Sequence, residues 1–216
     1  MSKLRLVAVR DLPAMPESAR RGIHVIDVFL RGAPTPWRRL EVPSAIALER
    51  LHEVLQETFG WYNWGPHSFL SVYGEFGGPV RPGSRAAKRE AERLDESGVT
   101  LAQIAGKEGV WIAYEYGYRD EWLVDIRVER IRPATPGVAY PRCTGGHGED
   151  TPGDLYGGVR EFNAERAEED EDEGLREDDY FDPEYLTEDL SDLATVIIPA
   201  PNEAHGILRS SLDHLD

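Results

Sequence analysis

Alternation of apolar and polar residues predicts several β-strands in this chain. Residues 24–32 (HVIDVFLRG) and 37–42 (WRRLEV) alternate, with Ala-Pro-Thr-Pro between them, and indicate a hairpin. Residues 67–73 predict a third strand, and residues 110–117 and 122–131 predict two more, joined by a tight turn at 118–121. In the last strand, Trp122, Val124, Ile126 and Val128 alternate with polar neighbours, which predicts one buried face and one wet face.

A different period, typical of an amphipathic helix, follows the first hairpin. Leu48, Leu51, Leu55 and Phe59 form one apolar stripe, with Ser44 as the expected N-cap and Gly60 as the expected end. Residues 158–173 begin as a helix and become an acid run, and residues 181–194 predict a short helix capped by Asp182 with Pro183 at its first position. Residues 99–104 predict a short strand or a turn.

This order of elements predicts an α+β fold with a mostly antiparallel sheet, one long amphipathic helix packed on it, a Gly/Pro-rich loop and an acidic C-terminal helical segment. We expect an N-terminal arm over residues 1–22, a single domain over 23–194 and a C-terminal tail over 195–216. Within the domain, residues 84–97 are expected to form a charged insertion and residues 165–180 an acidic run.

Composition and charge indicate the cellular compartment and the class of partner that we expect. Among 216 residues there is one cysteine, which excludes an internal disulfide framework and is typical of a reducing cytosol. No apolar run is long enough for a signal peptide or a membrane span, so we expect a cytoplasmic protein that does not contact membranes. Residues 145–216 hold 22 of the 40 acidic and 4 of the 24 basic residues, a net charge of −18, which leaves +2 for residues 1–144. Direct nucleic-acid binding is therefore not expected, and the acidic segment is expected to be solvated or to attract a basic partner.

The stretch YPRCTGGHGEDTPGDLYGG, residues 140–158, gathers side chains that bind metals. Thiolate, imidazole and carboxylate groups come from Cys143, His147, Asp150 and Asp154, with His52 and His67 as outside ligands from the predicted helix and third strand. The spacing matches no strong metal signature, and the glycines suit tight turns. We favour a structural loop that needs no cofactor, with zinc or another divalent metal as the alternative.

The sequence gives little support for a catalytic, nucleotide-binding or phosphate-binding site. The chain has no nucleophile elbow, no P-loop and no dinucleotide-binding glycine motif. Arg38 and Arg39 beside Trp37 have the chemistry to bind phosphate, but alternation sends them to opposite faces, which favours salt bridges.

Several of these segments resemble the plasmid pRi open-reading-frame-three-like family, whose members are sometimes labelled as passenger proteins of insertion sequences. PTPWRRLEVPSAIALERLHEVLQETFGW, YEYGYRDEWLVDI, the Cys143 loop and DYFDPEYL match its pattern over residues 23–194. The matching positions are Trp37, Arg38, Leu51, His52, Phe59, Gly60, Trp61, Tyr114, Tyr116, Gly117, Trp122, Cys143, Gly146, Pro152, Asp154, Gly157 and Gly158. Gly153 stands where the pattern has Glu. The resemblance implies an α+β roll in a plasmid or mobile-element context and no established reaction.

We therefore expect a non-catalytic module that binds a protein partner. Its expected contact residues are aromatic and basic: Trp37, Arg38, Trp61, Trp64, Tyr116 and Trp122. The alternatives are a metal-binding protein or metal-dependent hydrolase built on the loop at residues 143–154, and an acidic mimic of nucleic acid.

Overall fold

A computed structural model describes residues 11–33, 36–79, 93–117, 122–148, 151–153, 157–173 and 181–196, without the side chains of 168–173 and 196. Along this part of the chain, η labels 3-10 helices. The elements are η1 (Glu17–Arg21), β1 (Gly22–Leu30), β2 (Trp37–Pro43), α1 (Leu48–Phe59), β3 (His67–Ser71), β4 (Gly74–Gly77), β5 (Leu94–Asp95), α3 (Leu101–Ile104), β6 (Trp111–Tyr116), β7 (Trp122–Pro133), β8 (Ala139–Tyr140), β9 (Arg142–His147), α4 (Val159–Glu173), α5 (Pro183–Asp189), η2 (Leu190–Leu193) and β10 (Thr195–Val196).

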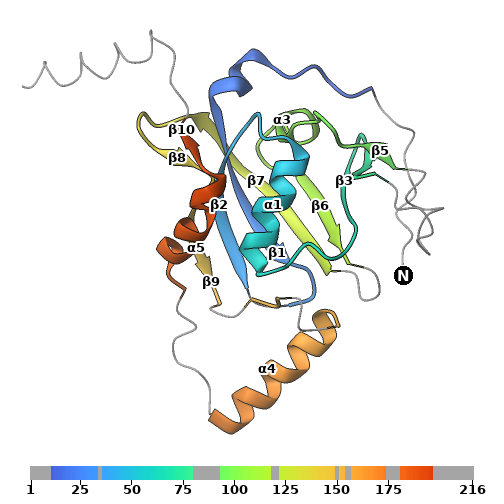
Figure 1. Ribbon diagram of the computed structural model, residues 1–216, viewed down its shortest axis with the longest axis vertical. Helices are drawn as coiled ribbons and strands as arrows, with labels where there is room; N and C mark the ends of the chain where they lie inside the picture. The colour runs from blue at the N-terminus through green and yellow to red at the C-terminus, as the bar shows by residue number, and fades with distance from the viewer. Residues whose placement is uncertain are drawn as a thin grey trace, which may run out of the picture.

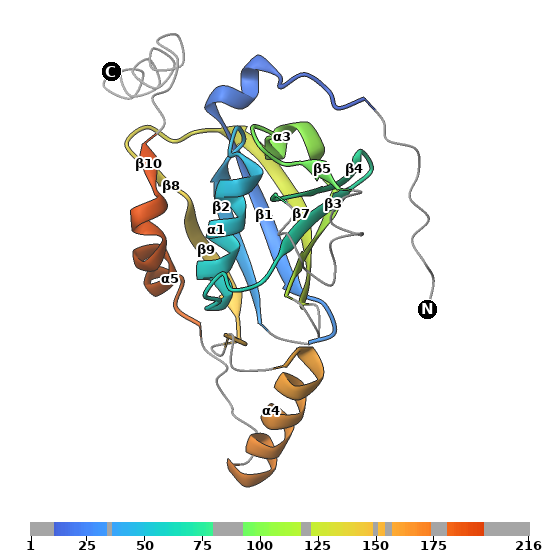
Figure 2. The ribbon, with the colours of Figure 1, turned by 45° about the vertical axis from the view of Figure 1, so that its right-hand side comes forward.

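One sheet of eight strands organises the molecule, in the order β5-β4-β3-β6-β7-β1-β2-β9. Every neighbouring pair is antiparallel except β4 and β5. Helix α1 lies across one face of the sheet, and α5 lies beside it on the same side (Figures 1 and 2). The structure is therefore of the α+β class, as the sequence predicts.

The core lies between α1 and the inner face of the sheet. Val28 of β1 pairs with Ile126 of β7, and both are fully buried. Alternate residues of β7 are buried, which confirms the prediction of one buried face for this strand. Leu48, Leu51, Leu55 and Phe59 of α1 supply the opposing layer at 0% exposure, which makes the hydrophobic burial beneath this helix a principal stabilising term.

Helix α1 ends as predicted but begins later. Gly60 has a φ of 67° in the left-handed region, where glycine lacks the steric penalty of other residues. The N-cap is Ala47, not Ser44, and the backbone N–H of Leu48 donates to the carbonyl of Val99 at 2.9 Å. The Ser44 hydroxyl instead lies 2.8 Å from Nδ1 of His24. The prediction of Ser44 as cap is wrong because a tertiary partner has taken its hydroxyl.

Two further local predictions need correction, and one strand was missed. Residues 99–104 contain helix α3, whose capping box joins Thr100 and Gln103. Strand β4 was not predicted. The stretch at 140–158, predicted as a loop, contains β9, which pairs with β2. Position 146 in this strand has room only for glycine, because a Cβ there would lie 2.6 Å from the ring of Phe181.

Helix α5 begins as the sequence predicts. The carboxylate of Asp182 accepts a hydrogen bond from the backbone N–H of Glu184, and Pro183 occupies the first turn. Thr187, one turn later, holds the helix against β9: its hydroxyl lies 3.0 Å from both the backbone N and O of Cys143.

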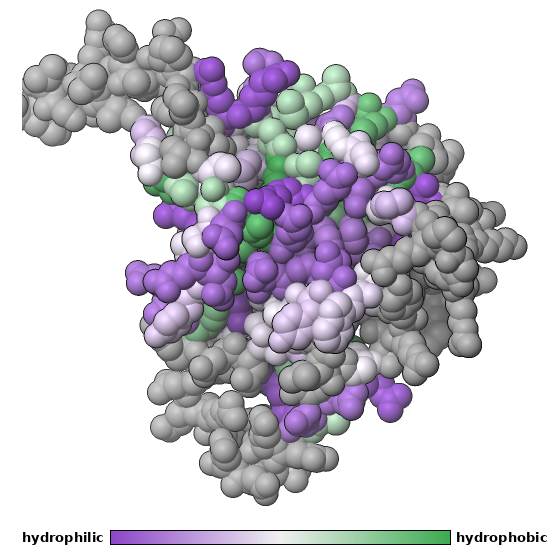
Figure 3. Space-filling model, viewed as in Figure 1, coloured by the Kyte–Doolittle hydropathy of each residue, from purple (hydrophilic) through white to green (hydrophobic). Residues whose placement is uncertain are grey.

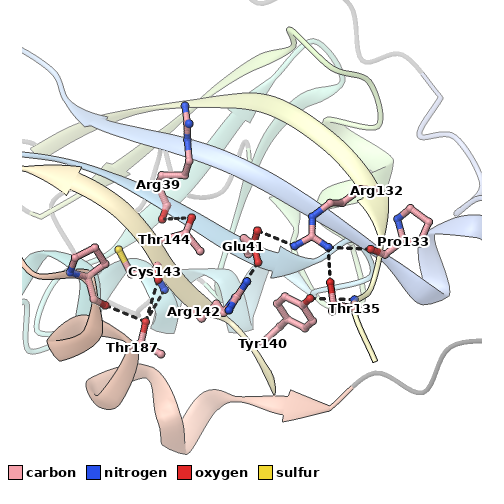
Figure 4. A network of polar contacts seen from close by, with 11 residues as sticks. Arg39, Glu41, Arg132, Pro133, Thr135, Tyr140, Arg142, Cys143, Thr144 and Thr187 are labelled. Atoms are coloured by element: carbon pink, nitrogen blue, oxygen red, sulfur yellow. Dashed lines mark hydrogen bonds and ion pairs between the residues drawn. The ribbon is translucent and has the colours of Figure 1, made fainter. Parts of the chain in front are cut away.

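The outer face of the sheet, opposite α1, is polar. Asp27 accepts hydrogen bonds from Arg39 at 2.6 and 2.9 Å and from Arg127 at 2.8 Å. Farther along, Glu41 bridges Arg132 and Arg142 at 2.7 and 2.8 Å (Figure 4). Burial alone would raise the pKa of each carboxyl, but the arginine hydrogen bonds and charges outweigh it and lower both pKa values.

Some predicted features lie outside the described residues. These are the turn at 118–121, most of the insertion at 84–97 and much of the acidic run, although the backbone of residues 165–173 belongs to α4. The division into arm, domain and tail stays a prediction. Within the described ranges, no helix is long and apolar enough to cross a membrane.

Candidate functional site

Two histidines from different elements, one in the second turn of α1, stack face to face. His52 of α1 and His67 of β3 have ring centroids 3.6 Å apart and planes inclined by 8°. The sequence predicted both as outside ligands of a metal site, and the fold brings them into contact with each other. Their immediate neighbours are polar, which is unusual in an otherwise apolar core.

Four side chains form a closed ring of hydrogen bonds around His52. Gln56 Nε2 donates to the hydroxyl of Tyr114 at 2.8 Å, and this hydroxyl lies 2.7 Å from His52 Nδ1. His52 Nε2 lies 3.0 Å from Asn63 Oδ1, and the backbone N–H of Asn63 donates to Gln56 Oε1 at 2.8 Å. Every group is satisfied if Tyr114 donates to Nδ1 and His52 donates from Nε2.

The ring requires a neutral His52. The pKa of this imidazole is lowered to about 3, mainly by burial and also by electrostatic repulsion from His67, and the hydrogen bond to Asn63 opposes the shift only in part. His52 is therefore a fixed hydrogen-bonding unit at physiological pH.

His67, on the other side of the stack, faces a carboxylate. Its Nε2 lies 3.0 Å from both carboxyl oxygens of Glu96, whose side chain is buried. Gly78 packs closely beside this carboxylate, since a Cβ there would lie 3.3 Å from Glu96 Oε1. The pair anchors the strand β3 to the segment after β5.

Directly after α1, the segment of residues 60–66 (GWYNWGP), here the aromatic loop, leaves the buried cluster for the surface. Trp61 points inward at 4% exposure, whereas Tyr62 and Trp64 are 64% and 69% exposed with ring centroids 5.2 Å apart. Asn63, between them, has a φ of 56°, a left-handed conformation that few residues other than glycine adopt.

Backbone hydrogen bonds hold the aromatic loop in this shape. The N–H of Trp61 donates to the carbonyl of Gln56 at 2.9 Å, and the N–H of Trp64 donates to the hydroxyl of Tyr116 at 3.0 Å. With the two contacts of Asn63, the loop is tied to α1 and β6 at residues 61, 63 and 64. The buried cluster thus presents two exposed aromatic rings on a rigid support.

The fold divides the predicted aromatic contact residues between the core and the surface. Trp61, Tyr116 and Trp122 are buried at 4%, 2% and 4% exposure, and the Trp61 ring lies tilted against both of the others in the core. They carry the aromatic loop and do not form its surface. Trp64 alone of the predicted set is on this loop and strongly exposed.

Trp37 and Arg38 lie on β2, away from the aromatic loop. Trp37 stacks on Phe29 on the outer face of the sheet, with ring centroids 6.2 Å apart. Arg38 is 1% exposed, donates to the carbonyl of His147 at 2.8 Å and lies 3.7 Å from the ring centroid of Phe181. The salt bridge expected for Arg38 stays a prediction, and its side chain is buried on the side of the sheet that carries α5.

The other predicted metal ligands lie elsewhere. Cys143 and His147 are on β9, at the opposite end of the sheet from the β4–β5 pair, with four strands between β9 and β3. Burial raises the pKa of the Cys143 thiol, which lies 3.4 Å from the carbonyl of Gly145. Asp150 and Asp154 lie outside the described residues. In the part of the chain that the structure describes, no three His, Cys, Asp or Glu side chains form a group able to hold a metal ion.

Comparison with known proteins identifies the family. The family model described as plasmid pRiA4b ORF-3-like protein matches residues 23–189, most of the chain. The chain belongs to the plasmid pRiA4b ORF-3-like family. The resemblance inferred from the Trp37–Arg38, His52 and Phe59–Trp61 positions is thereby confirmed.

Two relatives of this plasmid pRiA4b ORF-3-like chain extend the comparison. It is 34% identical over 131 residues to the uncharacterized protein y4hQ of Sinorhizobium fredii (strain NBRC 101917 / NGR234), covering 60% of this chain and 64%, less than two thirds, of that protein. The crystal structure of MM3350, a protein of unknown function from Methanosarcina mazei Go1, superposes with a TM-score of 0.59 at 26% identity, covering 76% of this chain and 95% of the other.

Sequence reasoning missed most of the polar cluster. Gln56, Asn63, Glu96 and Tyr114 come from four separate segments, and only the fold brings them together. One signal was present: Asn63 follows the helix-ending Gly60 by three residues, and Asn is one of the few residues that tolerate a left-handed conformation.

Proposed function

We propose that the protein is a non-catalytic interaction module, an accessory protein of a plasmid or mobile element, that binds a protein partner through the aromatic loop. The observation that carries this proposal is the exposed pair Tyr62 and Trp64, held on a loop whose conformation the buried His52 ring stabilises. Tyr and Trp are the residues most enriched at the energetic centres of protein interfaces.

The cost of binding also favours this surface. A partner that docks on a flexible loop must order it, at about 0.5–1.5 kcal/mol for each immobilised side chain. Here three hydrogen bonds already fix the backbone at Trp61, Asn63 and Trp64. The left-handed Asn63 is a locally strained residue of the kind that clusters at binding sites.

The two alternative functions rest on other residues. A metal-dependent hydrolase would use the loop at 143–154, and a nucleic-acid mimic would use the acidic run; parts of both lie outside the described residues. They stay hypotheses without support from the described geometry.

Site-specific photo-crosslinking in the host cell tests the proposal. Benzoylphenylalanine replaces Tyr62 in one variant and Trp111 in the control, because Trp111 is also exposed, at 53%, but lies on the outer face of the sheet. We expect a discrete protein adduct from position 62 that is absent from position 111 and lost when Trp64→Ala is added. Identical adducts from both positions, or none from position 62, would contradict the proposal.

A further inference from the structure

The two helices on the inner side of the sheet expose a strongly unbalanced charge. In α1, α5 and η2, the acidic side chains outnumber the basic ones by seven to one. The acids are Glu49, Glu53, Glu57, Glu184, Glu188, Asp189 and Asp192, all exposed, and the base is Arg50. We call this surface the acidic helical face.

Its two halves lie together. Arg50 of α1 donates to the backbone carbonyl of Asp192 at 3.4 Å, and its guanidinium also contacts the carboxylate of Glu53. The one base is therefore already engaged within the surface. Figure 3 views the molecule from the side of α1 and shows hydrophilic side chains over most of this front.

The outer face of the sheet provides the contrast. There, carboxylates and guanidinium groups are matched, as in the pairs of Asp27 with Arg39 and Arg127 and of Glu41 with Arg132 and Arg142. Charge is thus matched on this outer face of the sheet, whereas acids are in excess on the acidic helical face.

Negative potential increases along α1 toward the aromatic loop. Glu57 lies in the last turn, where the helix dipole disfavours a negative charge and favours a positive one by about 0.3–1 kcal/mol. The described last turn has no basic residue to offset this. A cation brought by a partner would relieve the repulsion at this end of the helix.

Exposed aromatic rings border the same surface at two points. Tyr62 and Trp64 follow its α1 end, and Tyr185 of α5 is 71% exposed. Aromatic faces attract guanidinium and ammonium groups, by about 0.5–1 kcal/mol at exposed sites. Acids for charge pairing and rings for stacking are the two features that recognise arginine and lysine side chains.

We propose that the partner docks a basic segment, rich in arginine or lysine, along the acidic helical face with a cation stacked on Tyr62 or Trp64. This inference rests on the proposed function and specifies the partner's chemistry. A second copy of the chain is a poor occupant, because its net charge of −16 repels another copy. Nucleic acid is disfavoured for the same reason.

Peptide binding to the full-length protein tests the inference. The probe is fluorescein-labelled nona-arginine, with nona-glutamine as the uncharged control, measured by fluorescence anisotropy. Glu53→Lys/Glu57→Lys reverses two charges four residues apart on α1. Its matched control, Glu161→Lys/Glu165→Lys, makes the same change on α4, where both residues are also exposed.

A second readout locates the peptide. The protein has five tryptophans, so its ¹⁵N-labelled form gives five indole N–H resonances, and Trp64→Phe assigns the one that matters. We expect nona-arginine to shift the Trp64 resonance and to leave that of Trp111 in place. We also expect the α1 double variant to weaken binding by about tenfold or more and the α4 control by less than about twofold.

Three outcomes would overturn the inference: equal weakening by both double variants, an unmoved Trp64 resonance, or a Trp64 resonance that shifts with protein concentration alone, which would indicate self-association. These outcomes are separable from failure of the proposed function. If a partner crosslinks at position 62 but nona-arginine does not bind, the proposed function holds and the inference fails, because the docking segment of that partner is not basic.

Discussion

Both ring nitrogens of His52 are hydrogen-bonded, one to the hydroxyl of Tyr114 and the other to the side-chain amide of Asn63. A change in the protonation of His52 therefore disturbs the whole buried cluster. Neither the helical position of His52 nor the strand position of His67 indicates that they stack. The sequence supports the weaker statement that both lie near the sheet, because the positions of α1 and β3 could be predicted. Their mutual contact depends on side-chain directions that periodicity does not determine.

The depressed pKa of His52 predicts a specific pH dependence of stability. The unfolded chain binds a proton at His52 as the pH falls below about 6.5, and the folded chain does so only near 3. Folding stability is therefore lost progressively over this interval, by about 2 kcal/mol at pH 5 for this residue. His24, whose pKa burial also lowers, acts in the same direction.

Urea unfolding at pH 7 and pH 5 measures this effect. In His52→Asn, we expect the loss of stability between the two pH values to be about 2 kcal/mol smaller than in the wild type. Between pH 7 and pH 8 the two proteins should change equally, which is the internal control. An unchanged difference between pH 7 and pH 5 would show that His52 titrates normally in the folded state.

Replacement of Asn63 separates its conformation from its hydrogen bond. Asn63→Gly keeps a residue suited to a φ of 56° but removes the acceptor for His52, at an expected cost of about 1–2 kcal/mol. Asn63→Ala adds the left-handed penalty, about 1 kcal/mol more. Denaturant unfolding should rank the wild type above Gly and Gly above Ala; equal stability of Gly and wild type would argue against the hydrogen bond.

At the scale of elements, predictions succeeded where a local rule was sufficient and failed where a tertiary partner intervened. Gly60 ends α1 and Asp182 begins α5, both through local backbone geometry. Ser44 did not cap α1, because His24 binds its hydroxyl. Strand β9 was not predicted because its glycines are typical of turns. Gly146 in fact leaves room for the ring of Phe181, which packs against it.

The contact between α5 and β9 offers a test at this scale. Thr187→Val keeps the shape but removes the hydroxyl that contacts the backbone of Cys143, and leaves that N–H without its partner. We expect a loss of about 1–2 kcal/mol in the free energy of unfolding. Thr187→Ser retains the hydroxyl and should lose less; if Ser and Val are equally destabilised, the lost methyl and not the hydrogen bond matters.

For the whole molecule, the distribution of charge differs from the one that the sequence suggested. Counting residues places the excess acid in the C-terminal third, but folding sets α5 beside α1 and joins their acids into one surface. The front part of the chain is nearly neutral because its 20 basic residues offset its 18 acidic ones, and Asp27 shows how some of these charges pair across strands. Linear charge counts cannot reveal either arrangement, since both depend on which strands become neighbours.

The ion-pair network across β1, β2 and β7 predicts a graded response to charge removal. Asp27→Asn leaves Arg39 and Arg127 without their shared carboxylate and should cost about 2–4 kcal/mol, because the Asp27 side chain is only 2% exposed. Glu129→Gln removes an exposed partner of Arg127 and should cost less than about 1 kcal/mol. Similar losses for both variants, measured by urea unfolding, would contradict a special role for the buried carboxylate.

The contact between Cys143 and α5 makes the single thiol a reporter of the movement of that helix. Its side chain is 5% exposed, and its backbone is bonded to Thr187. Movement of α5 away from the sheet would admit an alkylating reagent to the sulfur. If reclosing is faster than the chemistry, the ratio of the observed alkylation rate to that of an unstructured thiol equals the fraction of time spent open. The alkylation rate of the Cys143 sulfur would then report how often α5, which carries part of the acidic helical face, separates from the sheet. A slower rate in the presence of a partner would show that the partner stabilises the docked helix.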